Sequence, residues 1–258
     1  ITGTIIEFDQ AQADLTAISG KTREELAGLT QQSKDLGATS QFTATQITEM
    51  QIELAKLGFT TSEIEASTEA VSNFASATGA DMASASKVAG SALRAFNLDA
   101  SQMERVVSVL GVATTKSALS FSSFETGLST IAPVAAKFGF SIEDTTALLG
   151  QLANAGFDAS SASTATRKIL LNLADANGEL AQELGRPIKS ADDLAGALQE
   201  LKEKGIDLGE ALELTDVKSV SAFATFIEGS DSLVGFRDSI TDVNQELKDM
   251  AEKKLDSV

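Results

Sequence analysis

The sequence contains no His, Cys, Tyr or Trp and only two prolines. Without His and Cys the chain can form no Ser-His-Asp or Cys-His catalytic system, no disulfide and no common zinc site. The sequence has 20 basic and 37 acidic residues. The resulting net charge of -17 opposes broad binding to nucleic acid phosphates or to an anionic membrane surface. No apolar run approaches the roughly 18 residues of a membrane span. These absences predict a protein-binding chain with no cofactor, no direct nucleic-acid binding and no membrane span in this segment.

Apolar residues recur every three or four positions through stretches rich in Ala, Leu, Glu, Gln, Lys and Ser, which is the period of an α-helix. Alternating strand patterns of five or more residues are hard to find, so the sequence predicts an all-α fold. The expected helices are 5–19, 22–36, 44–57, 61–78, 80–96, 100–116, 121–138, 142–155, 159–184 with a break at 177–178, 191–204, 216–228 and 231–255.

The same short motif recurs between these predicted helices, as in Gly58-Phe59-Thr60 and Gly139-Phe140-Ser141. The Gly suits the left-handed position that ends a helix, the apolar residue folds back onto the last turn, and the Thr or Ser caps the next helix. Reciprocal capping pairs are predicted for Thr60 with Glu63, Ser122 with Glu125 and Ser141 with Asp144. The predicted helix-junction residues are Gly37, Gly58, Phe59, Asn97, Gly139, Phe140, Gly156, Phe157 and Gly205.

Linkers of two to four residues leave room mainly for antiparallel neighbours. We therefore expect a compact array of about eleven or twelve short antiparallel helices, with an irregular, solenoid-like stacking as the alternative. The junctions are too unevenly spaced for a regular solenoid.

The last predicted helix carries apolar residues at spacings of three and four, which form a heptad seam. The seam is shorter than the three to four heptads that define a coiled coil. Packing against the preceding helices and the start of a coiled coil that drives oligomerisation both remain open. We divide the chain into a helical core module, 1–228, and an amphipathic C-terminal helix, 229–258. The seam residues are Leu233, Phe236, Ile240, Val243, Leu247 and Met250.

The catalytic and nucleotide-binding motifs that the sequence suggests are incomplete. Ser84-Ala85-Ser86-Lys87 fits a Ser-x-x-Lys pattern but lacks its companion motifs, and the P-loop-like segment 111–117 has Thr115 where a Gly is required. The carboxylate pairs Glu24-Glu25 and Asp192-Asp193 stand at predicted helix starts, where the helix dipole favours negative charge. We assign no catalytic, cofactor-binding or metal-binding residue. A peptidoglycan hydrolase that uses two carboxylates stays a third hypothesis.

The order and spacing of these pieces resemble the core region of phage tail tape measure proteins over about residues 8–220. The matching residues are Phe8-Asp9 with Ala11, Leu36-Gly37-Ala38-Thr39, Phe42-Thr43-Ala44 with Gln46, Leu54-Ala55 with Gly58-Phe59-Thr60, Phe74-Ala75, Phe96-Asn97-Leu98, Pro133-Val134-Ala135 with Gly139-Phe140-Ser141 and Glu143, Leu152-Ala153 with Gly156, and Ala162, Thr164, Arg167 and Leu173. The sequence departs from the family pattern at Ser108 and Ser163.

The resemblance implies a structural virion protein of a phage or prophage tail, in which the chain occupies the tube lumen during assembly, sets tail length and leaves ahead of the DNA. It also implies a location in the tail lumen or tip, and in the host cytoplasm during assembly. The implied partners are tail tube and tail-tip proteins, tail assembly chaperones and further copies of the chain. The absent N-terminal Met suggests a module of a longer protein. A non-viral helical adaptor or coiled-coil module is the alternative.

Overall fold

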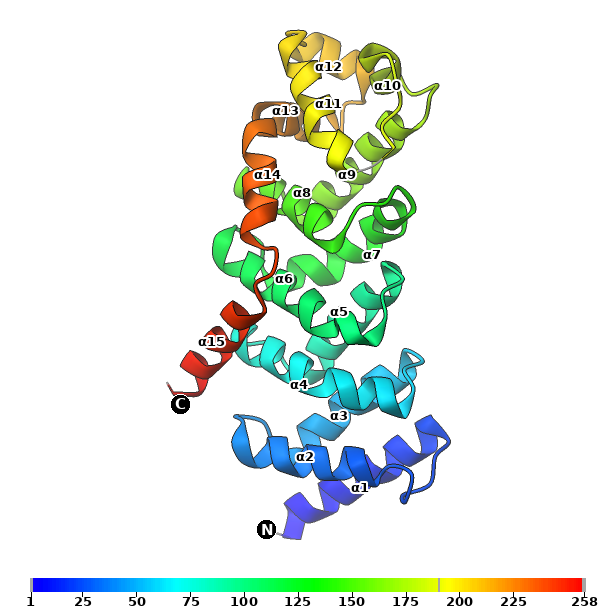
Figure 1. Ribbon diagram of the computed structural model, residues 1–258, viewed down its shortest axis with the longest axis vertical. Helices are drawn as coiled ribbons and strands as arrows, with labels where there is room; N and C mark the ends of the chain where they lie inside the picture. Colours follow the sequence, from blue (N-terminus) through cyan, green and yellow to red (C-terminus); the bar gives the residue numbers. More distant parts are fainter. Residues whose placement is uncertain (1, 190, 257–258) are drawn as a thin grey trace. The chain divides into compact units, whose positions relative to one another are not determined.

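The computed structural model describes residues 2–189 and 191–256, and every regular element in these ranges is a helix (Figure 1). The all-α prediction is confirmed, although the described residues form fifteen α-helices rather than eleven or twelve. The elements are α1 (Thr2–Ser19), α2 (Ala27–Thr39), α3 (Ala44–Lys56), α4 (Thr61–Thr78), α5 (Met82–Ala95), the 3₁₀ helix η1 (Ala100–Gln102), α6 (Met103–Lys116), α7 (Phe121–Lys137), α8 (Ile142–Asn154), α9 (Ala159–Ala174), α10 (Glu179–Leu184), α11 (Ala191–Glu203), α12 (Leu208–Leu214), α13 (Val220–Glu228), α14 (Ser230–Ser239) and α15 (Asn244–Leu255).

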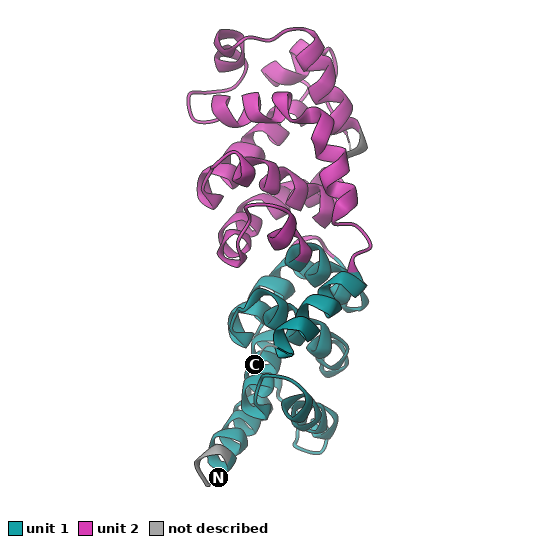
Figure 2. Cartoon of the chain, turned by 90° about the vertical axis from the view of Figure 1, so that its left-hand side faces the viewer, with its two compact units in different colours: residues 1–94, 98–111, 244–258 teal, residues 95–97, 112–243 magenta. Residues whose placement is uncertain are grey.

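The chain forms two compact units (Figure 2). Unit 1 contains residues 1–94, 98–111 and 244–258, and unit 2 contains residues 95–97 and 112–243. The last helix, α15, therefore belongs to the same unit as α1. These boundaries differ from the division at residue 228 that the sequence suggested, because local patterning does not reveal which earlier helices a C-terminal segment packs against.

Helix starts are fixed by side chains that accept hydrogen bonds from otherwise unpaired backbone N–H groups. Thr60 and Ser141 form capping boxes with Glu63 and Asp144, as predicted. The prediction for Ser122 is wrong, since α7 begins two residues earlier than that pairing requires. Its capping box joins Ser120 and Ser123.

Most predicted junction residues lie where a helix ends. Gly58, Gly139, Gly156 and Gly205 have φ between 75° and 89°, and Asn97 has φ 52°. After α3, Phe59 N–H donates to Leu54 O at 3.1 Å and Gly58 N–H donates to Ala55 O at 3.0 Å, which is a Schellman motif. The same pair of bonds follows α7 and α8 at the positions of Phe140 and Phe157. This backbone geometry produces the short turns from α3 to α4, from α7 to α8 and from α8 to α9.

Gly37 does not end a helix, so that junction prediction is wrong. It lies inside α2, two residues before the last residue, Thr39. A Cβ at this position would lie 2.6 Å from the backbone nitrogen of Ala44. Gly37 therefore permits close approach of the first turn of α3, and this need arises from packing rather than from a left-handed conformation.

Gly139→Ala is expected to destabilise unit 2 by about 1–2 kcal/mol, because an L-residue is strained at its φ of 77°. The matched control is Gly196→Ala, which lies in α11 with no atom within 4 Å of the added Cβ. That substitution is expected to stabilise the protein by about 0.5–1 kcal/mol. Urea unfolding followed by far-UV circular dichroism measures both. Equal effects of the two substitutions on stability would contradict the left-handed conformation assigned to Gly139.

Unit 1 contains a buried polar network that joins α1, α2 and α3. Gln12 Nε2 donates to Thr48 Oγ1 at 2.9 Å, Thr48 Oγ1 donates to Ser33 Oγ at 3.1 Å, and Ser33 Oγ donates to Gln51 Oε1 at 3.1 Å. Thr30 Oγ1 donates to Gln12 Oε1 at 2.6 Å. Ser33, Thr48 and Gln51 are fully buried. Because each hydroxyl and amide needs its partner, the network fixes the register of the three helices.

Gln51→Leu is expected to lower the free energy of unfolding by about 1–3 kcal/mol, because the buried Ser33 hydroxyl loses its acceptor. Gln31→Leu makes the same chemical change on the exposed face of α2, where a change within about 0.5 kcal/mol is expected. Denaturant titration compares the two variants. If Gln51→Leu left stability unchanged, the network would not be important for the fold.

Candidate interaction surfaces

The six seam residues do not lie on one helix, so the prediction of a continuous helix over 231–255 is wrong. Leu233 and Phe236 belong to α14, Leu247 and Met250 belong to α15, and Ile240 and Val243 lie in the connection between them. Asp242 in this connection has φ 56°, which ends the helical geometry. A coiled coil through all six residues needs an uninterrupted helix, which this segment does not form.

The two halves of the segment pack within different units. In unit 1, α15 packs on α4, and Leu247 lies over Gly111, where a Cβ would collide with its side chain. Lys248 also forms an ion pair with Glu104 at 2.6 Å. In unit 2, α14 packs on α8 and α11, and Phe236 covers Gly150 in the same way. The glycines thus provide recesses for large side chains of helices that follow much later in the sequence.

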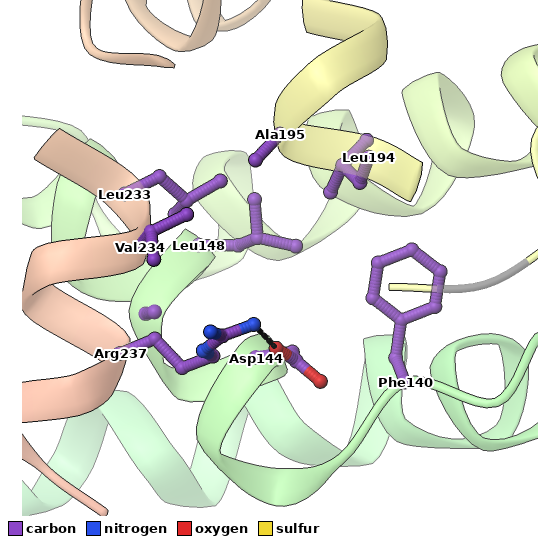
Figure 3. Close-up of a pocket in the computed structure, with 9 residues that line it drawn as sticks. Phe140, Asp144, Leu148, Leu194, Ala195, Leu233, Val234 and Arg237 are labelled. Carbon is purple, nitrogen blue, oxygen red and sulfur yellow. Dashed lines mark hydrogen bonds and ion pairs between the residues drawn. The ribbon is translucent and has the colours of Figure 1, made fainter. Parts of the chain in front are cut away.

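A small cavity lies between α8, α11 and α14 in unit 2 (Figure 3). Phe140, Leu148, Leu194 and Leu233 surround it, and an Arg237 nitrogen lies 3.5 Å from Asp144 Oδ1 at one side. Asp238 and then Asp144 raise the pKa of Arg237. The cavity volume of about 20 Å³ is sufficient for about one water molecule, so this is a packing defect rather than a ligand site.

Carboxyl groups in unit 1 and unit 2 serve as helix caps and ion-pair partners. The backbone N–H of Thr60 holds the pKa of Glu63 below its ordinary value, and Arg94 adds to this effect. Hydrogen bonds from Ser161 lower the pKa of Asp158, and the Lys168 ammonium lowers that of Asp216. A glycosidase needs one carboxylic acid with a raised pKa as its proton donor. These lowered values favour structural roles for the three groups.

The Glu24–Glu25 pair gives the hydrolase hypothesis no support. Glu24 and Glu25 are exposed, and backbone hydrogen bonds lower both pKa values. The Asp192 side chain lies outside the described residues. Within the described ranges, no group of three or more Asp or Glu residues is placed to hold a metal ion. No helix of residues 2–189 and 191–256 is both long and apolar enough to cross a membrane.

A groove that sequence reasoning missed lies between α12 and α13 in unit 2. Ile206, Leu208 and Ala211 line one side, and Phe223 and Ile227 line the other. The sequence contains a signal for α12, since Asp207 and Glu210 form the capping box of this helix. No helix was expected between 204 and 216, because a helix of 7 residues is too short to show a clear period.

The described residues define an all-α protein built from short helices joined by tight turns. A model of the family described as phage-related minor tail protein matches residues 30–186. The chain belongs to this family.

Two curated relatives extend the comparison. The chain is 31% identical over 229 residues to the tape measure protein of Pneumococcus phage Dp-1, covering 89% of this chain and 20% of the relative. It is 31% identical over 191 residues to the probable tape measure protein of Escherichia phage P2, covering 72% of this chain and 23% of the relative. The chain thus spans about a fifth of the length of the curated relatives it matches. No solved structure matches it significantly.

Proposed function

We propose that this chain is a folded structural module of a phage or prophage tail tape measure protein, which helps set tail length during assembly and leaves ahead of the DNA. The observation that carries the proposal is the similarity to two tape measure proteins, one of which aligns over 89% of the chain. The all-α fold and the absence of His and Cys from the sequence support a structural rather than a catalytic role.

The helix lengths support a particular role for this module within such a protein. The longest described helices, α1 and α4, have 18 residues, and an α-helix rises about 1.5 Å per residue. Each therefore extends only about 27 Å before the chain turns. An array of turning helices is too interrupted for a continuous ruler, so the measuring part lies outside these 258 residues. We assign this module to anchoring or assembly near one end of the ruler.

The proposed location is the tail lumen or tail tip in the virion, and the host cytoplasm during assembly. The proposed partners are tail tube and tail-tip proteins, tail assembly chaperones and further copies of the chain. The two relatives, whose names describe tape measure proteins, support this setting. A net charge of -17 supports contact with proteins rather than with DNA.

Deleting residues 1–228 from the full-length protein in an infecting phage is expected to block assembly of infectious tails. The matched control deletes an equal length from the part of that protein outside these 258 residues, which we propose to be long and helical. The control is expected to give shorter tails, by about 1.5 Å per deleted residue. Electron microscopy and plaque counts measure both results. Infectious tails of normal length without residues 1–228 would overturn the assignment.

A further inference from the structure

The groove between α12 and α13 is large enough for side chains from another molecule. Its volume is about 300 Å³, and its floor includes the buried residues Ala211 and Phe223. Leu208, on the edge of the groove, is 67% exposed. Leu212, on the same short helix, is 43% exposed. Leu208 and Leu212 therefore add exposed apolar surface beside the recess.

The edge of the groove is acidic. Asp207 and Glu228 both line it, and both are exposed. Among the described residues the Glu228 carboxylate forms no ion pair. The nearby Lys202 pairs with Asp231 at 2.7 Å and donates only to the Glu228 backbone carbonyl, at 3.4 Å. Glu228 is the last residue of α13 and directly precedes Gly229, the N-cap of α14, so the dipoles of the two helices act on its charge in opposite directions. The exposed carboxylate is therefore available to a cation of a partner protein.

We propose that the α12–α13 groove binds an amphipathic helix of a partner protein, with an apolar face seated over Leu208 and Ile227 and a Lys or Arg beside Glu228. Apolar side chains at i, i+3, i+4 and i+7 of such a helix match an apolar recess of this kind. The acidic edge supplies charge complementarity to a basic partner.

The same charges disfavour the other occupants. A second copy of the chain also carries a net charge of -17, and like charges oppose self-association through this face. Nucleic acid and anionic lipid present negative charge to Asp207 and Glu228. The proposal goes beyond the tail role, since the groove is defined by its own residues and stands whether or not the module anchors a ruler.

The first test measures binding of a synthetic amphipathic peptide of about 18 residues, with Leu on one face and Lys along one edge, to the full 258-residue chain. Fluorescence anisotropy is expected to show binding that is at least about 10-fold tighter than for the same peptide with Glu in place of Lys. Leu208→Ala is expected to weaken binding about 10-fold, and Glu228→Lys about 3- to 10-fold.

Matched controls separate the groove from general surface effects. Val217→Ala changes an apolar residue that is 80% exposed but does not line the groove, and Glu125→Lys changes an exposed acid on α7. Both are expected to leave binding unchanged. Equal binding of the Lys and Glu peptides, or equal loss with Glu125→Lys and Glu228→Lys, would overturn the charge argument. Binding that Leu208→Ala does not weaken would overturn the groove itself.

The second test identifies the natural occupant. A photo-crosslinking amino acid at position 208 of the full-length protein, in infected cells, is expected to crosslink to a helix with basic residues in another protein. Mass spectrometry of the crosslinked peptides reads the result. Crosslinks to a second copy of the chain, to nucleic acid or to lipid would overturn the proposal. These outcomes are independent of tail length, so failure here is distinguishable from failure of the proposed function.

Discussion

Leu247→Ala is expected to lower the free energy of unfolding of unit 1 by about 2–5 kcal/mol. Leu247 is only 2% exposed, and its side chain occupies the recess over Gly111 in α6. Truncation leaves a cavity there, because the backbone of α6 and α15 is held by further contacts such as the Lys248–Glu104 ion pair. The loss should appear in unit 1, to which α15 belongs.

Hydrogen exchange measured by mass spectrometry assigns this loss to a unit, because the chain has no Trp or Tyr whose fluorescence could report it. Leu255→Ala is the matched control, since Leu255 ends the same helix and is 41% exposed. Its expected cost is below about 1 kcal/mol. Sedimentation velocity should show no change of oligomeric state for Leu247→Ala. A change in association with no loss of stability would restore the coiled-coil interpretation of the seam.

Phe124→Ala is expected to destabilise unit 2 by about 3–5 kcal/mol. Phe124 lies on α7, which packs against α9, and it is only 1% exposed. An aromatic ring removed from so enclosed a position leaves a cavity that neighbouring side chains fill only in part. Unit 2 is expected to unfold at lower urea concentration while the exchange protection of unit 1 stays unchanged.

Phe157→Ala provides the comparison for Phe124→Ala. Phe157 lies just after α8 in a helix-ending turn and is only half-buried, so its removal exposes less of the core. We expect a loss of no more than about 2 kcal/mol. Similar losses for the two substitutions would show that Phe124 is not an enclosed anchor of the α7–α9 contact.

The sequence predicted helix ends more accurately than helix partners. Gly58 and Gly139 and their capping neighbours act within six residues, so their effect on the backbone is visible in the sequence. Gly37 shows the limit of this reasoning. Its role depends on the approach of Ala44 in another helix, and a sequence pattern holds no signal for that distance.

The C-terminal segment shows a different limit. The heptad spacing from Leu233 to Met250 is real, yet the structure breaks the helix between Ser239 and Asn244 and gives the two parts to different units. The periodicity indicated burial of one face, and Leu233, Ile240 and Leu247 are indeed buried. It could not indicate the partner, because an apolar stripe fits any complementary surface.

The sequence by itself determined that this protein is all-α, where most of its helices begin and end, and that common His- and Cys-based chemistry is absent. These properties depend on residue types and on interactions between near neighbours in the chain. Only the tertiary structure decided the two units, the docking of α15 over Gly111, the Gln12–Thr48–Ser33–Gln51 network and the acidic α12–α13 groove. The first three bring together residues distant in the chain, and the groove depends on how two successive helices pack against each other. No local pattern encodes these contacts, because they depend on shape and packing.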